Sequence, residues 1–100
     1  MNDASRTMAD ILLQIQAVHC NIEQPFTFTS GTISPMYVDC RKIISFPRER
    51  KKAVHLFTEI VERHMLRKDI QVIAGGETAG IPFAALLADS LNLPMIYITI

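Results

Sequence analysis

Three of the four glycines in this sequence lie close together, at Gly75, Gly76 and Gly80. The apolar residues 72–74 before them are typical of a short strand, and the residues after Gly80 favour a helix. Glycine permits positive φ and lets a ligand approach the backbone, and the free N–H groups at the start of a helix attract anions. The pattern predicts a phosphate-binding corner at the carboxyl end of a strand, where open α/β sheets bind ligands.

The spacing of these glycines fits neither of two common nucleotide motifs. The dinucleotide fingerprint needs Gly-x-Gly-x-x-Gly, and the Walker A motif needs a lysine directly after its last glycine. A tight turn needed only for packing explains the glycines about as well. Glu77 and Thr78 favour ligand binding, because a buried packing turn has little use for a carboxylate and a hydroxyl.

Charged residues are sparse around this corner. From Ile70 to Ile100 there is no Lys or Arg, and the only charged residues are Glu77 and Asp89. A bound polyphosphate would need positive charge from a metal ion, a neighbouring chain or sequence beyond residue 100. Residues 95–100 form a nearly continuous apolar run, typical of a parallel strand buried on both faces. We therefore expect the chain to be a fragment whose sheet continues.

Length and composition narrow the class of protein. One hundred residues correspond to one small domain or part of one. Ten basic residues balance ten acidic ones, so we expect neither a nucleic acid nor a membrane as partner. Cys20 and Cys40 have no CxxC spacing and follow no apolar signal peptide, which favours structural thiols in a reducing, cytoplasmic location. The three histidines have no metal-ligand spacing, and we assign no metal-ligating residues.

A hairpin is expected early in the chain. Residues 26–29 alternate aromatic and β-branched side chains, and residues 33–39 form a second apolar strand. Ser30-Gly31 turns the chain between them, and Pro35 places the second strand at an edge or a bulge. We expect this hairpin to form a small flap, or hood, beside the main sheet.

The other elements alternate helix and strand. The pattern predicts a first helix over about residues 4–20, capped by Asp3 or Ser5, and a second helix that begins with Ser45 as its N-cap and Pro47 in its first turn. A strand at 71–74 follows, then a helix over about 78–91 that ends at Asn92, and a strand at 95–99. The buried stripe of the second helix is Ala53, Val54, Phe57, Ile60, Val61 and Met65. The basic run at 48–52 is read as its solvated face. This order predicts an α/β domain with a parallel sheet, divided into residues 1–45 and 46–100.

Two stretches together resemble one enzyme family. FTFTSG at 26–31 and SPMYVDCR at 34–41 are similar to the hood signature of orotate phosphoribosyltransferases. AGGETAGIPFA at 74–84 resembles the pyrophosphate-binding loop and following helix of the same enzymes. Neither motif is decisive alone, but the two occur in the family's order and spacing over residues 8–99.

The resemblance implies the start of a type I phosphoribosyltransferase sheet with flanking helices, an N-terminal helix and a β-hairpin hood. It implies transfer of a phosphoribosyl group from 5-phosphoribosyl 1-diphosphate to orotate, giving orotidine 5′-monophosphate and pyrophosphate. Mg²⁺, held largely by substrate oxygens and water, would assist the reaction. A homodimer is implied as well, because family members borrow a catalytic loop across the subunit interface.

The same resemblance assigns the site residues. Thr78 and Ala79 would touch the diphosphate, while Gly76, Glu77 and Gly80 shape the turn. In the hood, the residues assigned to orotate are Thr29, Ser30, Tyr37 and Val38. Some members carry Lys in place of Thr29 and Tyr-Lys in place of Thr78-Ala79, so the chain resembles the branch without these cations.

No catalytic residue is assigned within the chain. The family's mobile catalytic loop would begin just after Thr99 and its ribose-phosphate loop further on, so we expect the fragment to be inactive alone. Three alternatives stay open: a phosphoribosyltransferase for a purine or uracil base, a non-catalytic relative that binds phosphoribosyl diphosphate or a nucleotide as a regulator, and an α/β domain whose glycine corner is only a turn.

Overall fold

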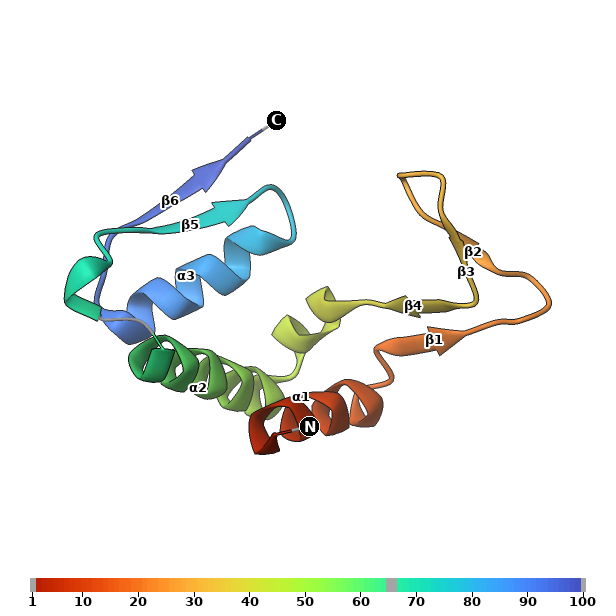
Figure 1. Ribbon diagram of the computed structural model, residues 1–100, viewed down its shortest axis with the longest axis horizontal. Coiled ribbons are helices and arrows are strands. Elements are labelled where there is room, and N and C mark those ends of the chain that lie inside the picture. Colours follow the sequence, from red (N-terminus) through yellow and green to blue (C-terminus); the bar gives the residue numbers. More distant parts are fainter. Residues whose placement is uncertain (1, 65–66, 100) are drawn as a thin grey trace. The chain divides into compact units, whose positions relative to one another are not determined.

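The computed structural model describes residues 2–64 and 67–99, and the chain divides into two compact units, Met1–Phe46 and Pro47–Ile100. The first unit contains α1 (Asp3–Gln14), β1 (Val18–Cys20), β2 (Phe26–Thr27), β3 (Ile33–Ser34), β4 (Met36–Val38) and the 3-10 helix η1 (Cys40–Ser45) (Figure 1). The second contains α2 (Pro47–His64), the 3-10 helix η2 (Arg67–Asp69), β5 (Ile73–Gly76), α3 (Gly80–Leu91) and β6 (Met95–Ile98).

Helix α1 is shorter than the sequence predicts, and its cap is different. The side chain of Asn2 accepts a hydrogen bond from the Ser5 N–H at 2.8 Å, so Asn2 caps the helix in place of Asp3 or Ser5. The predicted end near residue 20 is wrong because Gln16 takes a positive φ of 59° and Val18–Cys20 form a strand. Pairing with a later segment therefore overrides the helical periodicity.

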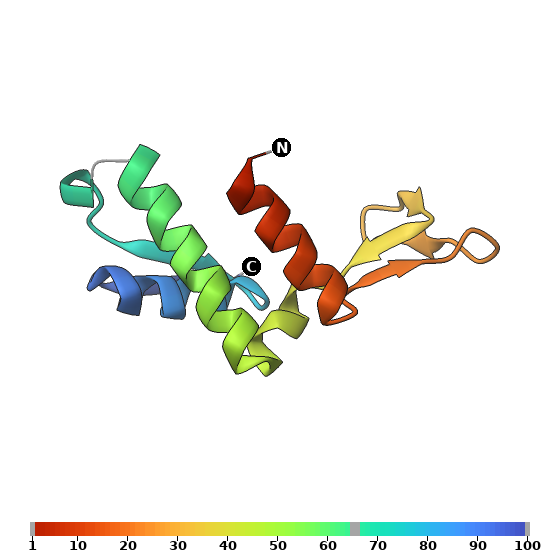
Figure 2. The same cartoon turned by 90° about the horizontal axis from the view of Figure 1, so that it is seen from below.

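Four short strands follow α1, and we call them the hood. The hairpin predicted across Ser30-Gly31 is confirmed as the antiparallel pair β2–β3, in which Phe26 lies opposite Ser34. The second predicted strand is interrupted at Pro35, and its later part, β4, pairs antiparallel with β1 (Figure 1 and Figure 2). The carbonyl of Pro35 accepts a hydrogen bond from the Asn21 N–H at 2.7 Å, which continues that pairing past the break.

The end of β4 is tied to the turn after α1 by two hydrogen bonds. The Asp39 N–H donates to the carbonyl of Ala17 at 2.9 Å, and Lys42 Nζ donates to the carbonyl of Gln16 at 3.0 Å. The buried apolar side chains of this unit are Ile11, Ile15, Ala17 and Ile43. These contacts fix where β1 begins.

Asp39 caps η1 through its carboxylate. Oδ1 accepts hydrogen bonds from the Arg41 backbone N–H at 3.2 Å and from Arg41 Nε at 2.9 Å. The side-chain hydrogen bond from Arg41 is the main cause that lowers the pKa of Asp39 from its usual value of 3.8. The same bond raises the pKa of the Arg41 guanidinium.

In the second unit, α2 begins at Pro47, so Phe46 precedes the helix at the position where the sequence predicts Ser45. Within the predicted stripe Ala53 is buried, Val54, Phe57 and Val61 are half-buried and Ile60 is exposed, while Met65 lies outside the described residues. Arg48 and Lys51 on the predicted solvated face are exposed.

Helices α2 and α3 pack together through an aromatic pair and a hydroxyl pair. The rings of Phe57 and Phe83 meet edge to face, with centroids 6.5 Å apart. Thr58 Oγ1 lies 2.7 Å from Ser90 Oγ and also donates to the carbonyl of Val54 at 2.8 Å. Because a hydroxyl has one proton, Ser90 must be the donor to Thr58.

Helix α3 lies close against β5 because Gly75 has no side chain. An ideal Cβ at Gly75 would stand 2.7 Å from Cβ of Ala84 and 2.7 Å from the carbonyl oxygen of Gly80. The buried residues on the inner face of α3 are Ala84, Ala88 and Leu91. The helix ends at Asn92, which takes a left-handed φ of 56°, as the sequence predicts.

Strands β5 and β6 form the predicted parallel pair, with Gly75 opposite Tyr97 and Gly76 opposite Ile98. Within this incomplete sheet the last strand is not buried on both faces. Ile96, Tyr97 and Ile98 are 52–60% exposed, because β5 is the one described strand that pairs with β6. Among the described residues, no helix is both long and apolar enough to cross a membrane.

Replacing Gly75 with alanine is expected to destabilise the complete protein by about 1–3 kcal/mol, because the new methyl group would overlap Ala84 and Gly80. The measurement is the free energy of unfolding from urea denaturation. Gly76→Ala is the matched control, since its methyl group would meet no atom within 4 Å. Equal unfolding free energies for the two variants would contradict the close packing of α3 on β5.

The carboxyl group of Asp39 is expected to titrate below 3.8 in the folded protein and to return toward 3.8 in Arg41→Ala. A pKa lowered by folding stabilises the fold above the unfolded pKa, and this contribution is lost as pH falls through the folded value. A carbon NMR titration of Asp39 measures both values. Arg48→Ala, which removes an exposed cation of α2, should leave the Asp39 pKa unchanged, and an unchanged pKa in Arg41→Ala as well would refute the assignment.

Candidate functional site

The glycine corner connects β5 directly to α3. Gly76 is the last residue of β5, and Gly80 is the first residue of α3. The Glu77 N–H still belongs to the sheet, because it donates to the carbonyl of Ile98 at 2.9 Å. The peptide bond between Glu77 and Thr78 is cis. Only Glu77, Thr78 and Ala79 therefore separate strand from helix, and all three are exposed.

The main chain of this corner presents unpaired donors. Among the described residues, the N–H groups of Thr78, Ala79 and Gly80 make no hydrogen bond to a protein acceptor. No side chain caps the helix at Ala79 either. The Thr78 carbonyl accepts from the Ile81 N–H at 3.2 Å, which closes the first turn. Free N–H groups at a helix N-terminus favour an anion such as a diphosphate.

The three glycines of the corner have different roles. None of them takes the positive φ that glycine permits, which among the described glycines occurs only at Gly31. Gly75 is required for packing, as described above. A Cβ at Gly76 would meet no atom within 4 Å, and one at Gly80 would make ordinary contact with Gly75 at 3.7 Å. Space beside Gly76 is therefore open to a ligand. The sequence allowed a packing role for the glycines but did not indicate that Gly75 is the one that has it.

The turn of the β2–β3 hairpin carries two of the predicted hood residues. Gly31 has a φ of 89°, and its N–H donates to the carbonyl of Phe28 at 2.8 Å. Ser30 Oγ lies 3.1 Å from Thr32 Oγ1, which orients one of the hydroxyl groups at the tip. Thr29 and Ser30 are both exposed.

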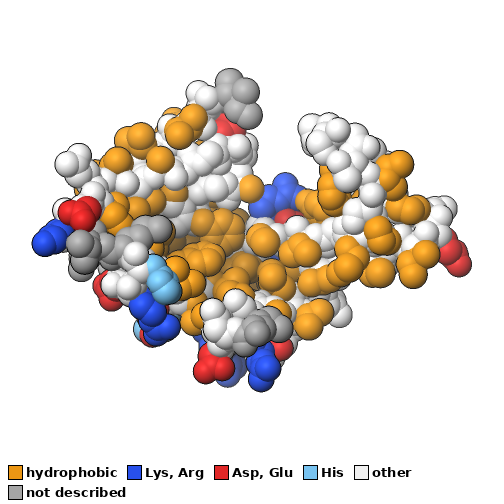
Figure 3. Space-filling view, viewed as in Figure 1, with side chains coloured by type: hydrophobic (Ala, Val, Ile, Leu, Met, Phe, Trp, Pro, Cys, Tyr) orange, Lys and Arg blue, Asp and Glu red, His pale blue; other side chains and the backbone are white. Residues whose placement is uncertain are grey.

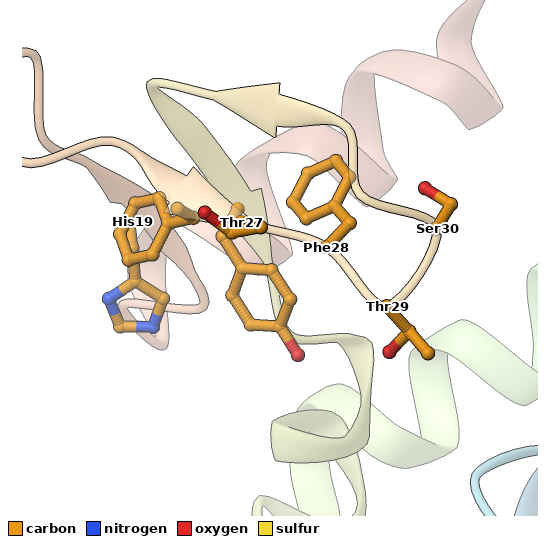
Figure 4. A pocket seen from close by; sticks show the side chains of 7 residues that line it. His19, Thr27, Phe28, Thr29 and Ser30 are labelled. Atoms are coloured by element: carbon orange, nitrogen blue, oxygen red, sulfur yellow. The ribbon is translucent and has the colours of Figure 1, made fainter.

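An open hollow with a volume of about 720 Å³ lies on one face of the hood. We call it the hood hollow, and its lining residues are His19, Phe26, Thr27, Phe28, Thr29, Ser30 and Tyr37. His19 lies at one end and the hairpin turn with Thr29 and Ser30 at the other (Figure 4). In the space-filling view, hydrophobic side chains extend along the strands, whereas the tip carries mainly uncharged polar groups (Figure 3).

Tyr37 is the centre of the aromatic wall. Its ring centroid lies 5.9 Å from that of Phe26, 6.3 Å from that of Phe28 and 6.3 Å from that of His19. His19 and Tyr37 are directly opposite each other in the β1–β4 pair, so their side chains project from the same face. These rings form an apolar surface that suits a planar ligand.

The structure brings together three of the four predicted hood residues. Val38 does not line the hollow, because successive side chains of a strand alternate between faces and its neighbour Tyr37 faces inward. Four further lining residues were missed by sequence reasoning: His19, Phe26, Thr27 and Phe28. The alternation of Phe26 and Phe28 was a usable signal, but His19 fell within the predicted helix.

Metal ligands are not grouped in the described part of the chain. Residues 2–64 and 67–99 contain no cluster of three or more His, Cys, Asp or Glu side chains able to hold a metal ion. Cys20 and Cys40 are both free and exposed. The candidate site residues therefore fall into two groups, the corner at Gly76–Gly80 in the second unit and the hood hollow in the first.

No family model matches the chain, but comparison with known proteins identifies relatives that share one name. Orotate phosphoribosyltransferase of Rhizobium johnstonii is 52% identical over 91 residues, and that of Agrobacterium fabrum is 53% identical over 90 residues. These alignments cover 91% and 90% of the chain but only 40% and 39% of the relatives. The chain thus spans about two-fifths of the length of the curated relatives it matches.

A solved structure agrees with these sequence relatives. The crystal structure of orotate phosphoribosyltransferase from Aeropyrum pernix matches 91% of the chain with a TM-score of 0.78 and 28% identity, and the match covers 52% of that protein. The predicted α/β architecture, with an incomplete parallel sheet, is thereby confirmed. Over nine-tenths of its length the chain is homologous to part of the orotate phosphoribosyltransferases, and the resemblance inferred from its two motifs is confirmed.

Proposed function

We propose that the complete protein transfers a phosphoribosyl group from 5-phosphoribosyl 1-diphosphate to orotate in the de novo biosynthesis of UMP. The products are orotidine 5′-monophosphate and pyrophosphate. The observation that carries this proposal is the similarity of nine-tenths of the chain to proteins named orotate phosphoribosyltransferase. The corner and the hood hollow supply surfaces that suit the two substrates.

In this proposal the corner at Gly76–Gly80 binds the diphosphate. The leaving pyrophosphate gains negative charge as its bond to the ribose carbon breaks. The N–H groups of Thr78, Ala79 and Gly80 have no protein acceptor among the described residues, so they can donate to its oxygens. Donors that the fold already holds in place stabilise such charge without reorganisation during the reaction. Open space beside Gly76 would let the diphosphate approach the backbone.

A Mg²⁺ ion bound to the diphosphate belongs to the same proposal. The exposed oxygen atoms of Glu77 and Thr78 are of the type that Mg²⁺ accepts, and this ion is usually held by phosphate and water oxygens with few protein ligands. When bound, it would supply positive charge to a stretch that contains no Lys or Arg between residues 70 and 100.

The hood hollow is proposed to receive the pyrimidine ring. The aromatic wall around Tyr37 offers a flat apolar surface, and the hydroxyl groups of Thr29 and Ser30 can form hydrogen bonds with polar atoms of the ring. Val38 supports this wall only as the strand neighbour of Tyr37 and the partner of Val18.

We also propose that the complete protein is a cytoplasmic homodimer and that its catalytic groups lie outside these 100 residues. The described residues supply binding surfaces, whereas the catalytic loop implied by the family resemblance would follow Thr99. The isolated 100-residue chain is accordingly proposed to be inactive.

The experiment that tests the function is a titration of the complete protein with phosphoribosyl diphosphate and Mg²⁺, with and without orotate, followed by the change in ultraviolet absorbance that accompanies formation of orotidine monophosphate. Product formation is the expected result. Binding of phosphoribosyl diphosphate without turnover would contradict the proposed enzymatic activity. It would favour the alternative that the protein is a non-catalytic relative that binds the same ligand.

Replacing Gly76 with valine in the complete protein is expected to weaken the binding of phosphoribosyl diphosphate about tenfold or more, equal to about 1.4 kcal/mol. A Cβ at this position would meet no atom within 4 Å, so the added side chain should obstruct the ligand more than it disturbs the fold. Calorimetric titration measures the dissociation constant, and Gly80→Val should act in the same direction.

Lys51→Ala is the control for these variants, because it removes an exposed charge of α2 outside the corner. Its dissociation constant should stay within about twofold of the wild type, since isolated surface charges contribute little. Equal, small effects of Gly76→Val and Lys51→Ala would eliminate the corner as the diphosphate site.

A further inference from the structure

We propose that His19 is a specificity-determining residue of the hood hollow, where it recognises the carboxylate that distinguishes orotate from neutral pyrimidines. This inference rests on the function proposed above and adds a residue to its base-binding surface. It starts from the position of His19 opposite Tyr37 in the β1–β4 pair.

The strand pairing aims the imidazole at the hollow. His19 and Tyr37 are cross-strand partners on one face, and their ring planes are inclined by 29° with centroids 6.3 Å apart. The imidazole therefore extends the aromatic wall at the end of the hollow opposite the hairpin turn (Figure 4). A planar ring lying against Tyr37 would have the His19 nitrogens near its edge.

Among the described residues, one side chain of the lining has the chemistry for this task. Of the seven residues that line the hollow, three are aromatic rings without a cationic group and three are hydroxyl residues. Within the described part of the chain, His19 is the one lining residue that can carry a positive charge, and its N–H groups can donate to a carboxylate. Hydrogen bonds with charged partners are about twice as strong as those between neutral groups.

Two charged residues lie beside this wall, and they are paired with each other. Arg41 Nε lies 2.9 Å from Asp39 Oδ1. Besides Arg41, His19 is one of the groups that lower the pKa of Asp39, and besides Asp39, Tyr37 is one of those that raise the pKa of Arg41. Neither Asp39 nor Arg41 lines the hollow. Tyr37, whose ring centroid lies 6.3 Å from that of His19, presents its ring to the hollow.

The test compares, with the complete protein, two ligands of nearly the same shape, orotate and its neutral carboxamide, in which the carboxylate is replaced by an uncharged amide. In His19→Phe the ring that stacks on Tyr37 is kept and the nitrogen atoms are lost. We expect the KM for orotate to rise about tenfold, while the inhibition constant of the carboxamide changes less than twofold and kcat is largely retained. His19→Arg, which restores a cation, should recover most of the affinity for orotate.

The outcomes separate this inference from the function on which it rests. If both constants rise together in His19→Phe, His19 only maintains the shape of the hollow and the inference is wrong. If neither constant changes, the carboxylate is recognised elsewhere and the inference is wrong again. Wild-type protein that forms no orotidine monophosphate would instead refute the proposed function itself, and the inference would be refuted with it.

Discussion

The close approach of α3 to β5 at Gly75 is the constraint on which the second unit depends. With no side chain at this position, the first turn of α3 comes so near the strand that a Cβ would lie 2.7 Å from the carbonyl oxygen of Gly80. Only three residues then connect strand and helix, too few to fold back over the helix terminus. The N–H groups of Thr78 and Ala79 consequently stay unpaired within the described chain, so a packing requirement leaves free the donors to which the proposed diphosphate would bind.

In the hood the corresponding constraint is the change of strand partner at Pro35. Proline has no N–H to donate to a ladder, and the chain on its two sides pairs with different strands, β2 before it and β1 after it. Aromatic rings from three separate strands meet at Tyr37 as a result. A continuous hairpin through residues 33–39, as the sequence alone predicts, would not have brought His19 to this wall.

These two constraints also explain which features the sequence could predict. Helices α2 and α3 and the parallel strands depend on local periodicity and on end signals such as Pro47 and Asn92, so they were predicted to within a few residues. Strand β1 forms because it pairs with residues 36–38, and the local sequence of Val18–Cys20 does not by itself predict a strand. Likewise a sequence reveals a run of glycines but not which one packs against a helix. Gly75 has the packing role, whereas the space beside Gly76 is open, as the proposed ligand binding requires.

The two groups of site residues differ in whether ligand binding would depend on main-chain groups or on side chains. The N–H donors of the corner are main-chain groups, so the proposed diphosphate binding does not depend on the side chains of Thr78 and Ala79. The hood hollow is lined by rings and hydroxyl groups, so the proposed recognition of the base depends on the side chains themselves. Under the proposed function, a change of base preference would require substitutions in the hood, whereas substitutions in the corner would alter affinity for the diphosphate whatever base is used. Affinity for the leaving group and selectivity for the base could then change independently.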